Sequence, residues 1–324
     1  MDTAPVQSCL DGFEDVGPGG PPVSRHGVHR DGYMAEYMAA TVSARNDIGD
    51  LPDPSDPERR ARCAASLCAF AEEYCSSILE HEPGPRLRLY AETLQVGIEG
   101  AGQIHVRMPR GVGKTTWVKA AIAWGLATGR LHYAVVFCAT TELASAIIDD
   151  VWRIFEDDAF AADFPEIAVP IAQAGGLSQR FAAQHQHGRL TRIKRSAREI
   201  HLPTIEGSPS SGAVLVARGA GAKTRGLVRG KRRPDMVLLD DLQSREDARN
   251  PTRVKKLVEW IGGDVQGLAG SRRLNAVMTS TPIVEGDLSC RYADAEEHPS
   301  WRLVEFHLVE GEAVAQVVAY CATT

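Results

Sequence analysis

The sequence has no pattern of paired cysteines. Its seven cysteines are odd in number, none of them forms a CxxC pair, and none has histidine partners at the spacing of a zinc site. A disulfide framework and a structural zinc site are therefore excluded as organising features of the fold. We interpret the cysteines as free thiols in a reducing cytoplasm.

Long apolar runs are also absent. The strongly apolar runs, such as residues 134–139, are far shorter than the about 20 residues that cross a bilayer. The N-terminal residues include Asp2, Glu14 and Asp15 and no apolar signal core. We therefore expect no membrane partner and no export.

An overall excess of positive charge is missing as well. The chain has 36 Lys and Arg against 42 Asp and Glu, a net charge of -6, so uniform electrostatic attachment to nucleic acid is not its general design. The basic residues are unevenly placed, however. Residues 189–233 hold 12 of them with 2 acidic residues, which leaves 24 basic and 40 acidic residues elsewhere. Such a stretch is either the local footprint that a phosphate backbone requires or a solvated basic surface.

The patterning divides the chain into four parts. Residues 1–57 are rich in Gly, Pro and small polar residues and predict a flexible N-terminal arm. Apolar residues at helical spacing predict helices over 58–81 and 86–98, which form a helical lead-in over 58–100. Residues 101–310 form the core, and 311–324 form a tail.

Within the core, short apolar segments alternate with helical ones. The strand candidates are residues 104–108, 133–139, 213–217, 236–239, 275–279 and 302–306. Helical periodicity covers several gaps between them, including 143–155 and 254–261. The alternation implies parallel crossovers, so the sequence predicts an α/β fold with a mostly parallel central sheet flanked by helices. Ligands bind such sheets beyond the carboxyl ends of the strands.

A phosphate-binding loop follows the first strand candidate. Residues 108–116 read MPRGVGKTT, and a helix-forming run continues from Trp117. The glycines let backbone N–H groups surround phosphates, and the helix N-terminus adds its positive dipole end. Lys114 would reach the β- and γ-phosphates, and the Thr115 hydroxyl would bind Mg²⁺. Met108 replaces the first glycine of the general pattern. The residues expected around the nucleotide are Gly111, Val112, Gly113, Lys114, Thr115 and Thr116.

An acidic site is predicted at the end of the strand candidate 236–239, where Asp240 and Asp241 follow four apolar residues. The strand would deliver Asp240 to the metal, while Asp241 would orient or deprotonate the attacking water. Without the phosphate-binding loop, the same run would indicate only a strand followed by a turn.

A third element lies in residues 277–282, which read VMTSTP. The hydroxyls of Thr279, Ser280 and Thr281 follow a strand and could hydrogen-bond a γ-phosphate or its water. The alternative is a strand followed by an ordinary proline turn.

A further run, GAGAKT at residues 219–224, superficially resembles a second phosphate-binding loop. Alanine precedes its lysine, and glycines and a proline follow in place of a helix. We interpret it as a mobile basic loop.

Taken together, these segments resemble one family. The order FAEEYCSSILEH, MPRGVGKTT, CATTELAS, RGLVRGKRRPDMVLLDDLQSREDARNP and VMTSTP extends over residues 70–307. This order is similar to that of the N-terminal ATPase half of the large terminase subunit, which packages DNA in tailed bacteriophages. The spacing of the RG, RG and RPD elements before the acidic pair, and of the segment 241–250 after it, is more specific than the phosphate-binding loop.

The resemblance implies a P-loop NTPase with a helicase- or RecA-like motor core, and ATP and Mg²⁺ as cofactors. It implies that Arg110 acts in cis as the residue that senses the γ-phosphate, together with Lys114 and Asp241 in catalysis. It further implies that residues 279–281 couple hydrolysis to movement. Gln95 is the candidate for the adenine-contacting glutamine that the family often carries upstream.

The partners that the resemblance implies are double-stranded DNA, the portal protein and the small terminase subunit, with a ring oligomer on the portal in the host cytoplasm. The candidate contacts to DNA or to a neighbouring subunit come from the basic stretch and are Arg225, Arg229, Lys231 and Arg232.

The sequence thus predicts an ATP-hydrolysing motor domain that drives duplex DNA into a procapsid. Two alternatives stay open: another helicase-like, nucleic-acid-dependent P-loop ATPase, or a truncated, non-catalytic remnant that binds DNA or packaging partners. Full-length family members continue into a nuclease domain of RNase H type, which the residues after 310 cannot hold, so we expect no nuclease activity from this chain.

Overall fold

The computed structural model describes residues 46–79, 82–174, 183–228, 232–271 and 274–307. Most of the expected arm, residues 1–45, and the expected tail, residues 311–324, lie outside the described residues. Residues 46–56, at the end of the expected arm, make specific contacts. The Ile48 N–H donates to the His185 carbonyl at 2.9 Å, and the Ser55 N–H donates to the Ala162 carbonyl at 2.9 Å.

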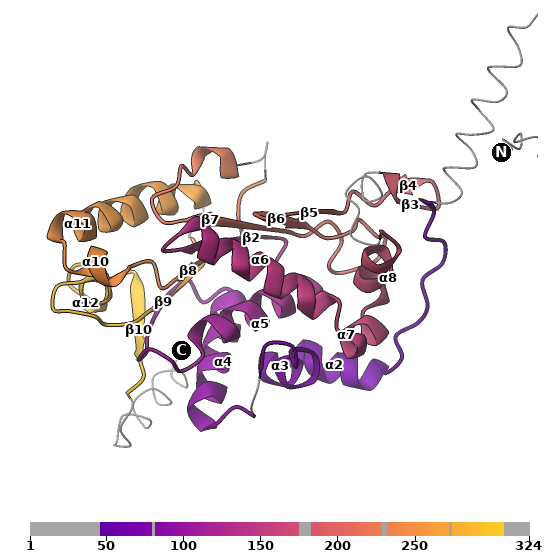
Figure 1. Ribbon diagram of the computed structural model, residues 1–324, viewed down its shortest axis with the longest axis horizontal. Coiled ribbons are helices and arrows are strands. Elements are labelled where there is room, and N and C mark those ends of the chain that lie inside the picture. Colours follow the sequence, from indigo (N-terminus) through magenta and orange to yellow (C-terminus); the bar gives the residue numbers. More distant parts are fainter. Residues whose placement is uncertain (1–45, 80–81, 175–182, 229–231, 272–273, 308–324) are drawn as a thin grey trace, which may run out of the picture. The chain divides into compact units, whose positions relative to one another are not determined.

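An eight-stranded sheet is the centre of the fold, with strand order β10-β1-β9-β8-β2-β7-β6-β5. The six strands from β10 to β7 pair in parallel. They are β1 (Gln103–Arg107), β2 (Tyr133–Cys138), β7 (Val214–Gly219), β8 (Met236–Asp240), β9 (Ala276–Ser280) and β10 (Trp301–Glu305). These are the six strands that the apolar runs predict, so the α/β fold class is confirmed (Figure 1).

The sequence does not reveal the antiparallel part of the sheet. Strands β5 (Lys194–Ser196) and β6 (Glu199–His201) form a hairpin that pairs antiparallel with β7 at the sheet edge. A separate pair joins β3 (His185–Gln186) to β4 (Arg189–Leu190). These strands are only two or three residues long and mostly polar, so they lack the apolar run that marks a buried strand.

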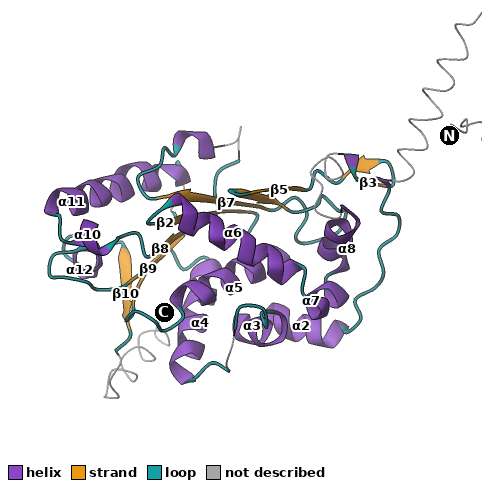
Figure 2. Cartoon of the chain, in the orientation of Figure 1, coloured by secondary structure: helices purple, strands orange, loops and turns teal. Residues whose placement is uncertain are grey.

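Helices cover both faces of the sheet (Figure 1 and Figure 2). One face carries α3 (Leu67–Tyr74), α4 (Pro85–Ile98), α5 (Lys114–Ala127), α6 (Thr141–Phe155), α7 (Asp158–Asp163) and α8 (Pro165–Ala174). The other face carries α11 (Pro251–Trp260), a π-helical turn (Ile261–Val265) and α12 (Leu288–Ala293), and α10 (Arg245–Ala248) precedes α11. The lead-in begins with α2 (Pro57–Ala65).

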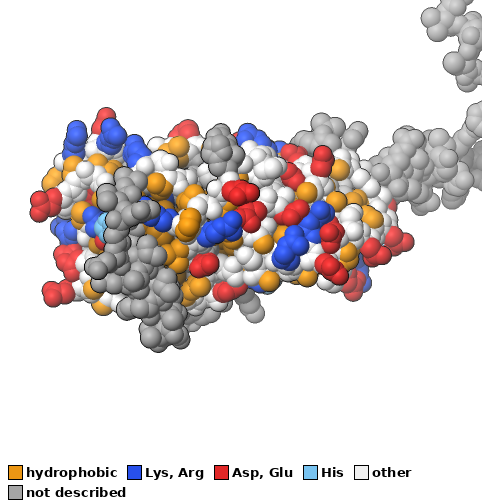
Figure 3. Space-filling model, turned by 90° about the horizontal axis from the view of Figure 1, so that it is seen from below, with side chains coloured by type: hydrophobic (Ala, Val, Ile, Leu, Met, Phe, Trp, Pro, Cys, Tyr) orange, Lys and Arg blue, Asp and Glu red, His pale blue; other side chains and the backbone are white. Residues whose placement is uncertain are grey.

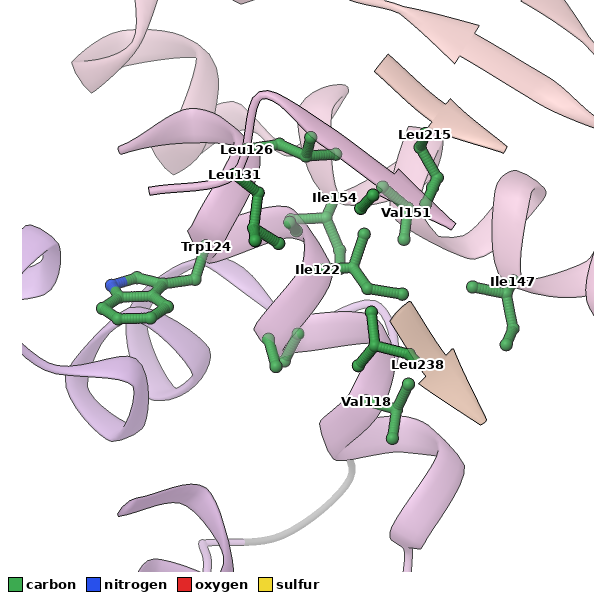
Figure 4. Close-up of a cluster of buried hydrophobic side chains, with 14 of the residues drawn as sticks. Val118, Ile122, Trp124, Leu126, Leu131, Ile147, Val151, Ile154, Leu215 and Leu238 are labelled. Carbon is green, nitrogen blue, oxygen red and sulfur yellow. The ribbon is translucent and has the colours of Figure 1, made fainter. Parts of the chain in front are cut away.

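Alternation along the strands produces these two cores. In β2, Ala134, Val136 and Cys138 pack with α5 and α6, whereas the intervening Tyr133, Val135 and Phe137 pack with the α11 side. Figure 4 shows the first core, where side chains of α5 and α6 meet Leu215 of β7 and Leu238 of β8. Both faces of the sheet are therefore buried, as parallel sheets require.

The single helix predicted over 58–81 is interrupted at Ser66. This residue has extended backbone angles (φ -137°, ψ 120°), and its hydroxyl accepts a hydrogen bond from the Ala69 N–H at 3.3 Å. Ser66 thus ends α2 and caps α3. The apolar periodicity continues across the break, which is why the sequence indicates one helix.

A buried carboxylate fixes this lead-in to the core. Asp163 of α7 is fully buried and accepts hydrogen bonds from Arg59 Nε at 2.6 Å and from the Tyr74 hydroxyl at 2.7 Å. The Asp56 N–H adds a third bond at 3.1 Å. Burial acts to raise the pKa of Asp163, but these hydrogen bonds hold it below its ordinary value.

We expect Asp163→Ala to lower the free energy of unfolding by about 3 kcal/mol or more, because Arg59 and Tyr74 lose their buried partner. The exposed Asp158 of the same helix is the matched control, and Asp158→Ala should cost under about 1 kcal/mol. Urea unfolding of both variants measures the difference. Equal losses would contradict a specific role for the Asp163 contacts.

Candidate functional site

Three of the predicted motifs meet at the carboxyl edge of the sheet. Strand β9 lies between β1 and β8. The parallel register places Ser280 opposite Arg107 on one side and Thr279 opposite Asp240 on the other. The loop 108–116, the acidic pair and the hydroxyl run therefore leave neighbouring strands at one place.

The loop has the backbone that its glycines predict. Gly111 and Gly113 have positive φ angles of 81° and 84°, a region that side-chain-bearing residues rarely adopt. Gly113 caps α5, so the helix begins at Lys114. Met108, which replaces the first glycine, is buried, and its N–H donates to the Ser280 carbonyl at 3.0 Å. It continues the strand pairing without a positive φ, so this position needs no glycine.

Lys114 is buried at the centre of the site. Its Nζ donates to Thr281 Oγ1 at 2.7 Å and to the Pro109 carbonyl at 2.9 Å, and it lies 3.6 Å from Asp241 Oδ2. The Thr281 hydroxyl also donates to Asp241, with distances of 3.1 and 3.3 Å to the two carboxylate oxygens. Lys114, Thr281 and Asp241 thus form a continuous polar chain.

Asp240 is the buried acid of the pair. It accepts hydrogen bonds from the Thr115 hydroxyl at 2.7 Å and from the Thr279 hydroxyl at 2.5 Å. Burial raises its pKa, and the neighbouring Asp241 charge adds to this, while the two hydroxyls and Lys114 act in the opposite direction. A cation at this position would offset the cost of the buried charge.

Thr115 and Asp240 fit a Mg²⁺ ion that phosphates and water also coordinate. The described residues contain no group of three or more His, Cys, Asp or Glu that could hold a metal by themselves. Mg²⁺ in nucleotide sites characteristically takes only one or two protein ligands and completes its shell with phosphate and water oxygens. The pairing of Thr115 Oγ1 with Asp240 is consistent with such a site.

Asp241 adopts an unusual backbone conformation. Its φ is 40°, in the left-handed region, and its N–H donates to the Thr279 carbonyl at 3.0 Å. Consecutive side chains of a regular strand point to opposite faces. The left-handed turn instead leaves the carboxylate beside Thr281 and Lys114, next to the neighbouring Asp240. Strain of this kind is tolerated mainly at functional sites.

The structure divides the three expected coupling residues. Thr279 and Thr281 contact the acids, whereas the Ser280 hydroxyl lies 2.7 Å from His105 Nε2 and donates to Ser289 Oγ at 2.8 Å. His105 was not identified from the sequence, where it appears as one polar residue in an apolar strand. Burial lowers its pKa to about 4, so it is neutral at physiological pH.

Other predicted residues are placed more simply. Arg110 is exposed and makes no hydrogen bond or ion pair within the described part of the chain. The run 219–224 is followed by a 3₁₀ turn of three residues, Arg225–Leu227, and Trp260 Nε1 donates to the Ala222 carbonyl at 3.1 Å. It therefore does not begin a helix as a phosphate-binding loop does.

The four candidate contacts of the basic stretch do not share one environment. Arg225 is exposed, whereas Arg232 donates to the His132 carbonyl at 2.9 Å and the Gly212 carbonyl at 3.2 Å, at the amino ends of β2 and β7. Arg229 and Lys231 lie outside the described residues. Several other basic residues of the stretch have acidic partners, as in the pairs Lys194–Glu199, Arg195–Asp149 and Arg218–Glu199.

The face of the molecule seen from below in Figure 3 shows basic and acidic side chains interspersed. No single-sign patch dominates this view. Within the described ranges, no helix has both the length and the apolar composition that crossing a bilayer requires.

Strand order, loop and acidic pair together define a P-loop NTPase fold. The loop strand β1 and the acidic strand β8 are separated by one strand that carries polar hydroxyls at its carboxyl end. Helix α5 follows the loop directly. Lys114 follows β1, Thr281 follows β9, and Asp240 and Asp241 stand at the end of β8. The arrangement therefore brings these side chains to one place from three strands.

Comparison with known proteins gives matches among solved structures only. No protein-family model and no curated protein matches the chain. The large terminase of bacteriophage HK97 is similar at 14% identity, with a TM-score of 0.47, over 76% of this chain and 44% of that one. This chain therefore spans less than half the length of that terminase.

Two structures of the large terminase ATPase domain of Thermus phage P74-26 are also similar. A mutant of this domain matches at 14% identity and a TM-score of 0.40, over 75% of this chain and 88% of that one. A second structure of the domain matches at 16% identity and a TM-score of 0.37, over 71% and 82%. All the TM-scores lie below 0.5, so the strand order and site residues of the chain itself define its fold.

We expect Asp240→Asn to stabilise the nucleotide-free protein by about 1 kcal/mol, or about 3 °C in thermal unfolding at neutral pH. The raised pKa means that the folded state binds a proton more tightly than the unfolded state, so the ionised carboxylate weakens folding at neutral pH. The gain should shrink as the pH falls through the raised pKa of Asp240 towards the ordinary aspartate value of 3.8, because the folded wild-type protein takes up the proton over this range.

Differential scanning calorimetry across this pH range measures the effect. The half-exposed Asp241, which pairs with Lys114, supplies the control, and Asp241→Asn should give no such gain. A lower melting temperature for Asp240→Asn at neutral pH would contradict the buried-charge interpretation.

Proposed function

We propose that the chain is the ATP-hydrolysing motor domain of a viral DNA-packaging terminase, which uses Mg·ATP hydrolysis to drive duplex DNA into a procapsid. The observation that carries the proposal is the convergence of Lys114, Thr115, Asp240, Asp241 and Thr281 at one edge of the sheet, through hydrogen bonds of 2.7 to 3.3 Å and the 3.6 Å ion pair. The terminase assignment rests on the motifs between residues 70 and 307.

Binding of the nucleotide would use the loop and the start of α5. The positive φ angles of Gly111 and Gly113 turn the loop backbone, and the partial positive charge at the N-terminus of α5 attracts phosphate. The Lys114 ammonium would exchange its oxygen partners Thr281 and Pro109 for phosphate oxygens. Thr115 and Asp240 would hold Mg²⁺, which neutralises charge on the phosphates when it is bound.

Hydrolysis would depend on Asp241 and two cations. The Asp241 carboxylate is less buried than Asp240 and can orient or deprotonate a water molecule. Lys114 and Arg110 would stabilise the charge that spreads over the phosphoryl oxygens in the transition state. Because Arg110 is exposed and makes no hydrogen bond or ion pair among the described residues, reaching the phosphates would break none.

Coupling to movement would pass through β9. Thr281 contacts both Lys114 and Asp241, so it responds to whatever changes at either group. Ser280, which precedes Thr281, donates a hydrogen bond to Ser289 at the start of α12. A shift of the end of β9 would thus be transmitted to α12 on the opposite face of the sheet.

The partners and setting are part of the same proposal. Duplex DNA, the portal protein and the small terminase subunit would bind a ring of these domains in the host cytoplasm. Two rivals are separable by experiment. Strand displacement on a forked substrate would favour another helicase-like ATPase, and absence of magnesium-dependent phosphate release would favour a non-catalytic remnant.

We expect Lys114→Ala to abolish ATP hydrolysis without unfolding the domain, because no other cation in the loop is buried beside the phosphate position. Asp241→Asn should retain Mg·ATP affinity but lose turnover by about a hundredfold or more, because only the chemical step needs its charge. Phosphate release, calorimetric binding and circular dichroism distinguish the two. Near-normal turnover in Lys114→Ala would refute the assignment of the loop.

Duplex DNA binding should fall steeply with salt and be insensitive to sequence. Arg225→Ala should reduce the slope of log K against log salt by about 1, because this side chain is exposed in the turn that follows β7 in the chain. Arg62→Ala is the matched control, an exposed arginine on α2 that should leave the slope unchanged. An unchanged slope in Arg225→Ala would contradict a DNA contact and favour the alternative, that Arg225 belongs to a solvated basic surface.

A further inference from the structure

A cavity of about 120 Å³ lies beside the phosphate-binding loop. The carboxyl ends of β1 and β10 and the turn after β9 surround it. Its apolar lining comes from Met108, Pro109, Pro282 and Phe306, and its polar lining includes Arg107 and Glu305. None of the roles assigned above to the site uses this space.

The cavity shares two residues with the phosphate site. The carbonyls of Met108 and Pro109 accept hydrogen bonds from Lys114 Nζ at 3.4 and 2.9 Å. The metal-side groups Asp240 and Asp241 lie on the β9 and β8 side of the loop, whereas β10 pairs with β1 on its other side. For a nucleotide whose phosphates contact Lys114 and whose metal contacts Asp240, the cavity lies on the β10 side of the loop, away from the two acids.

The lining suits a flat heterocycle with a polar edge. Arg107 Nη1 and Glu305 Oε1 form an ion pair at 3.0 Å, and both side chains remain partly exposed. Arg107 Nε is buried and has no hydrogen-bond partner within the described ranges. Adenine offers an exocyclic amine that can donate to a carboxylate and ring nitrogens that can accept from a guanidinium, while its faces suit proline, methionine and phenylalanine.

The upstream glutamine suggested by the family resemblance is engaged elsewhere. Gln95 Oε1 accepts from the Leu67 N–H at 2.9 Å, and its Nε2 donates to the Ala65 carbonyl at 3.1 Å and to Glu99 Oε1 at 3.2 Å. The side chain joins α4 to the break between α2 and α3. Its amide would have to abandon these contacts to bind a base.

We propose that the cavity between β1, β10 and Pro282 holds the nucleobase of the bound ATP, with Glu305 and Arg107 reading its edge. The proposal rests on the proposed function, because it assumes that the phosphates bind at Lys114. It makes Glu305 a determinant of nucleotide affinity that acts independently of the phosphate contacts.

Calorimetric titration of the full chain with Mg·ATP and with inorganic triphosphate tests this. Wild type should bind ATP at least tenfold more tightly than triphosphate. Glu305→Ala should lower the affinity for ATP by about tenfold and leave the affinity for triphosphate unchanged. Glu297→Ala is the matched control, because Glu297 is another partly exposed glutamate in an arginine ion pair, with Arg291, and both affinities should stay at wild-type values.

The outcomes separate this proposal from the proposed function. Equal binding of ATP and triphosphate by wild type, or an ATP preference that survives in Glu305→Ala, would overturn the base site and leave the phosphate site standing. Binding of neither ligand would overturn both. Loss of triphosphate affinity in Glu305→Ala would show that Glu305 acts on the phosphate site, and would also overturn the proposal.

A second measurement needs no variant. Photolabelling of the wild-type chain with 8-azido-ATP, followed by peptide mapping, should place the adduct on the peptides that contain Pro282 or Phe306, and excess ATP should suppress it. An ATP-sensitive adduct on the peptide that contains Gln95, or on any peptide away from the cavity, would place the base elsewhere.

Discussion

The hydrogen bond between Thr115 Oγ1 and Asp240 Oδ2, at 2.7 Å, is the contact on which the rest of the site depends. It joins the first turn of α5 to the end of β8 across the intervening β9. The contact requires the N-terminus of α5 and the end of β8 to lie side by side, with the buried Asp240 facing the half-buried Thr115. Lys114 precedes Thr115 in the chain. Its ammonium is held beside this contact by the hydroxyl of Thr281, which directly follows β9.

The same contact places a charge where the fold alone would not favour one. Asp240 is buried and its pKa is raised, although two hydroxyls stabilise the ionised form. Asp163 is a contrasting case in the same chain, because a guanidinium fully pairs it and its pKa is lowered. Asp163 therefore stabilises the fold, whereas Asp240 carries a buried negative charge that a bound cation would stabilise.

Much of the fold could be predicted because its signals are local. Buried parallel strands are apolar runs, and the residues that deliver Lys114 and Asp240 sit directly at the ends of such runs. The antiparallel hairpin at 194–201 could not be found, since it is short, polar and stabilised by its neighbour β7. The break at Ser66 could not be predicted, because one cap residue ends the helix while the apolar spacing continues unchanged across it.

The site was predictable in composition but not in detail. Spacing alone could not show that Ser280 lies against His105 while its neighbours contact the acids, because the direction of a side chain depends on strand pairing. Nor could it show that Arg232 hydrogen-bonds carbonyls at the amino ends of strands. Such contacts join residues about 100 or more positions apart in the chain, as in Arg232 with His132 and in His105 with Ser280.

A crystal structure with Mg²⁺ and a non-hydrolysable ATP analogue tests the central claim most directly. The account predicts the ion between Thr115 Oγ1 and the Asp240 carboxylate, and Lys114 Nζ within hydrogen-bond distance of phosphate oxygens instead of the Pro109 carbonyl. An analogue bound away from the loop 108–116, or an ion held by neither Thr115 nor Asp240, would contradict it.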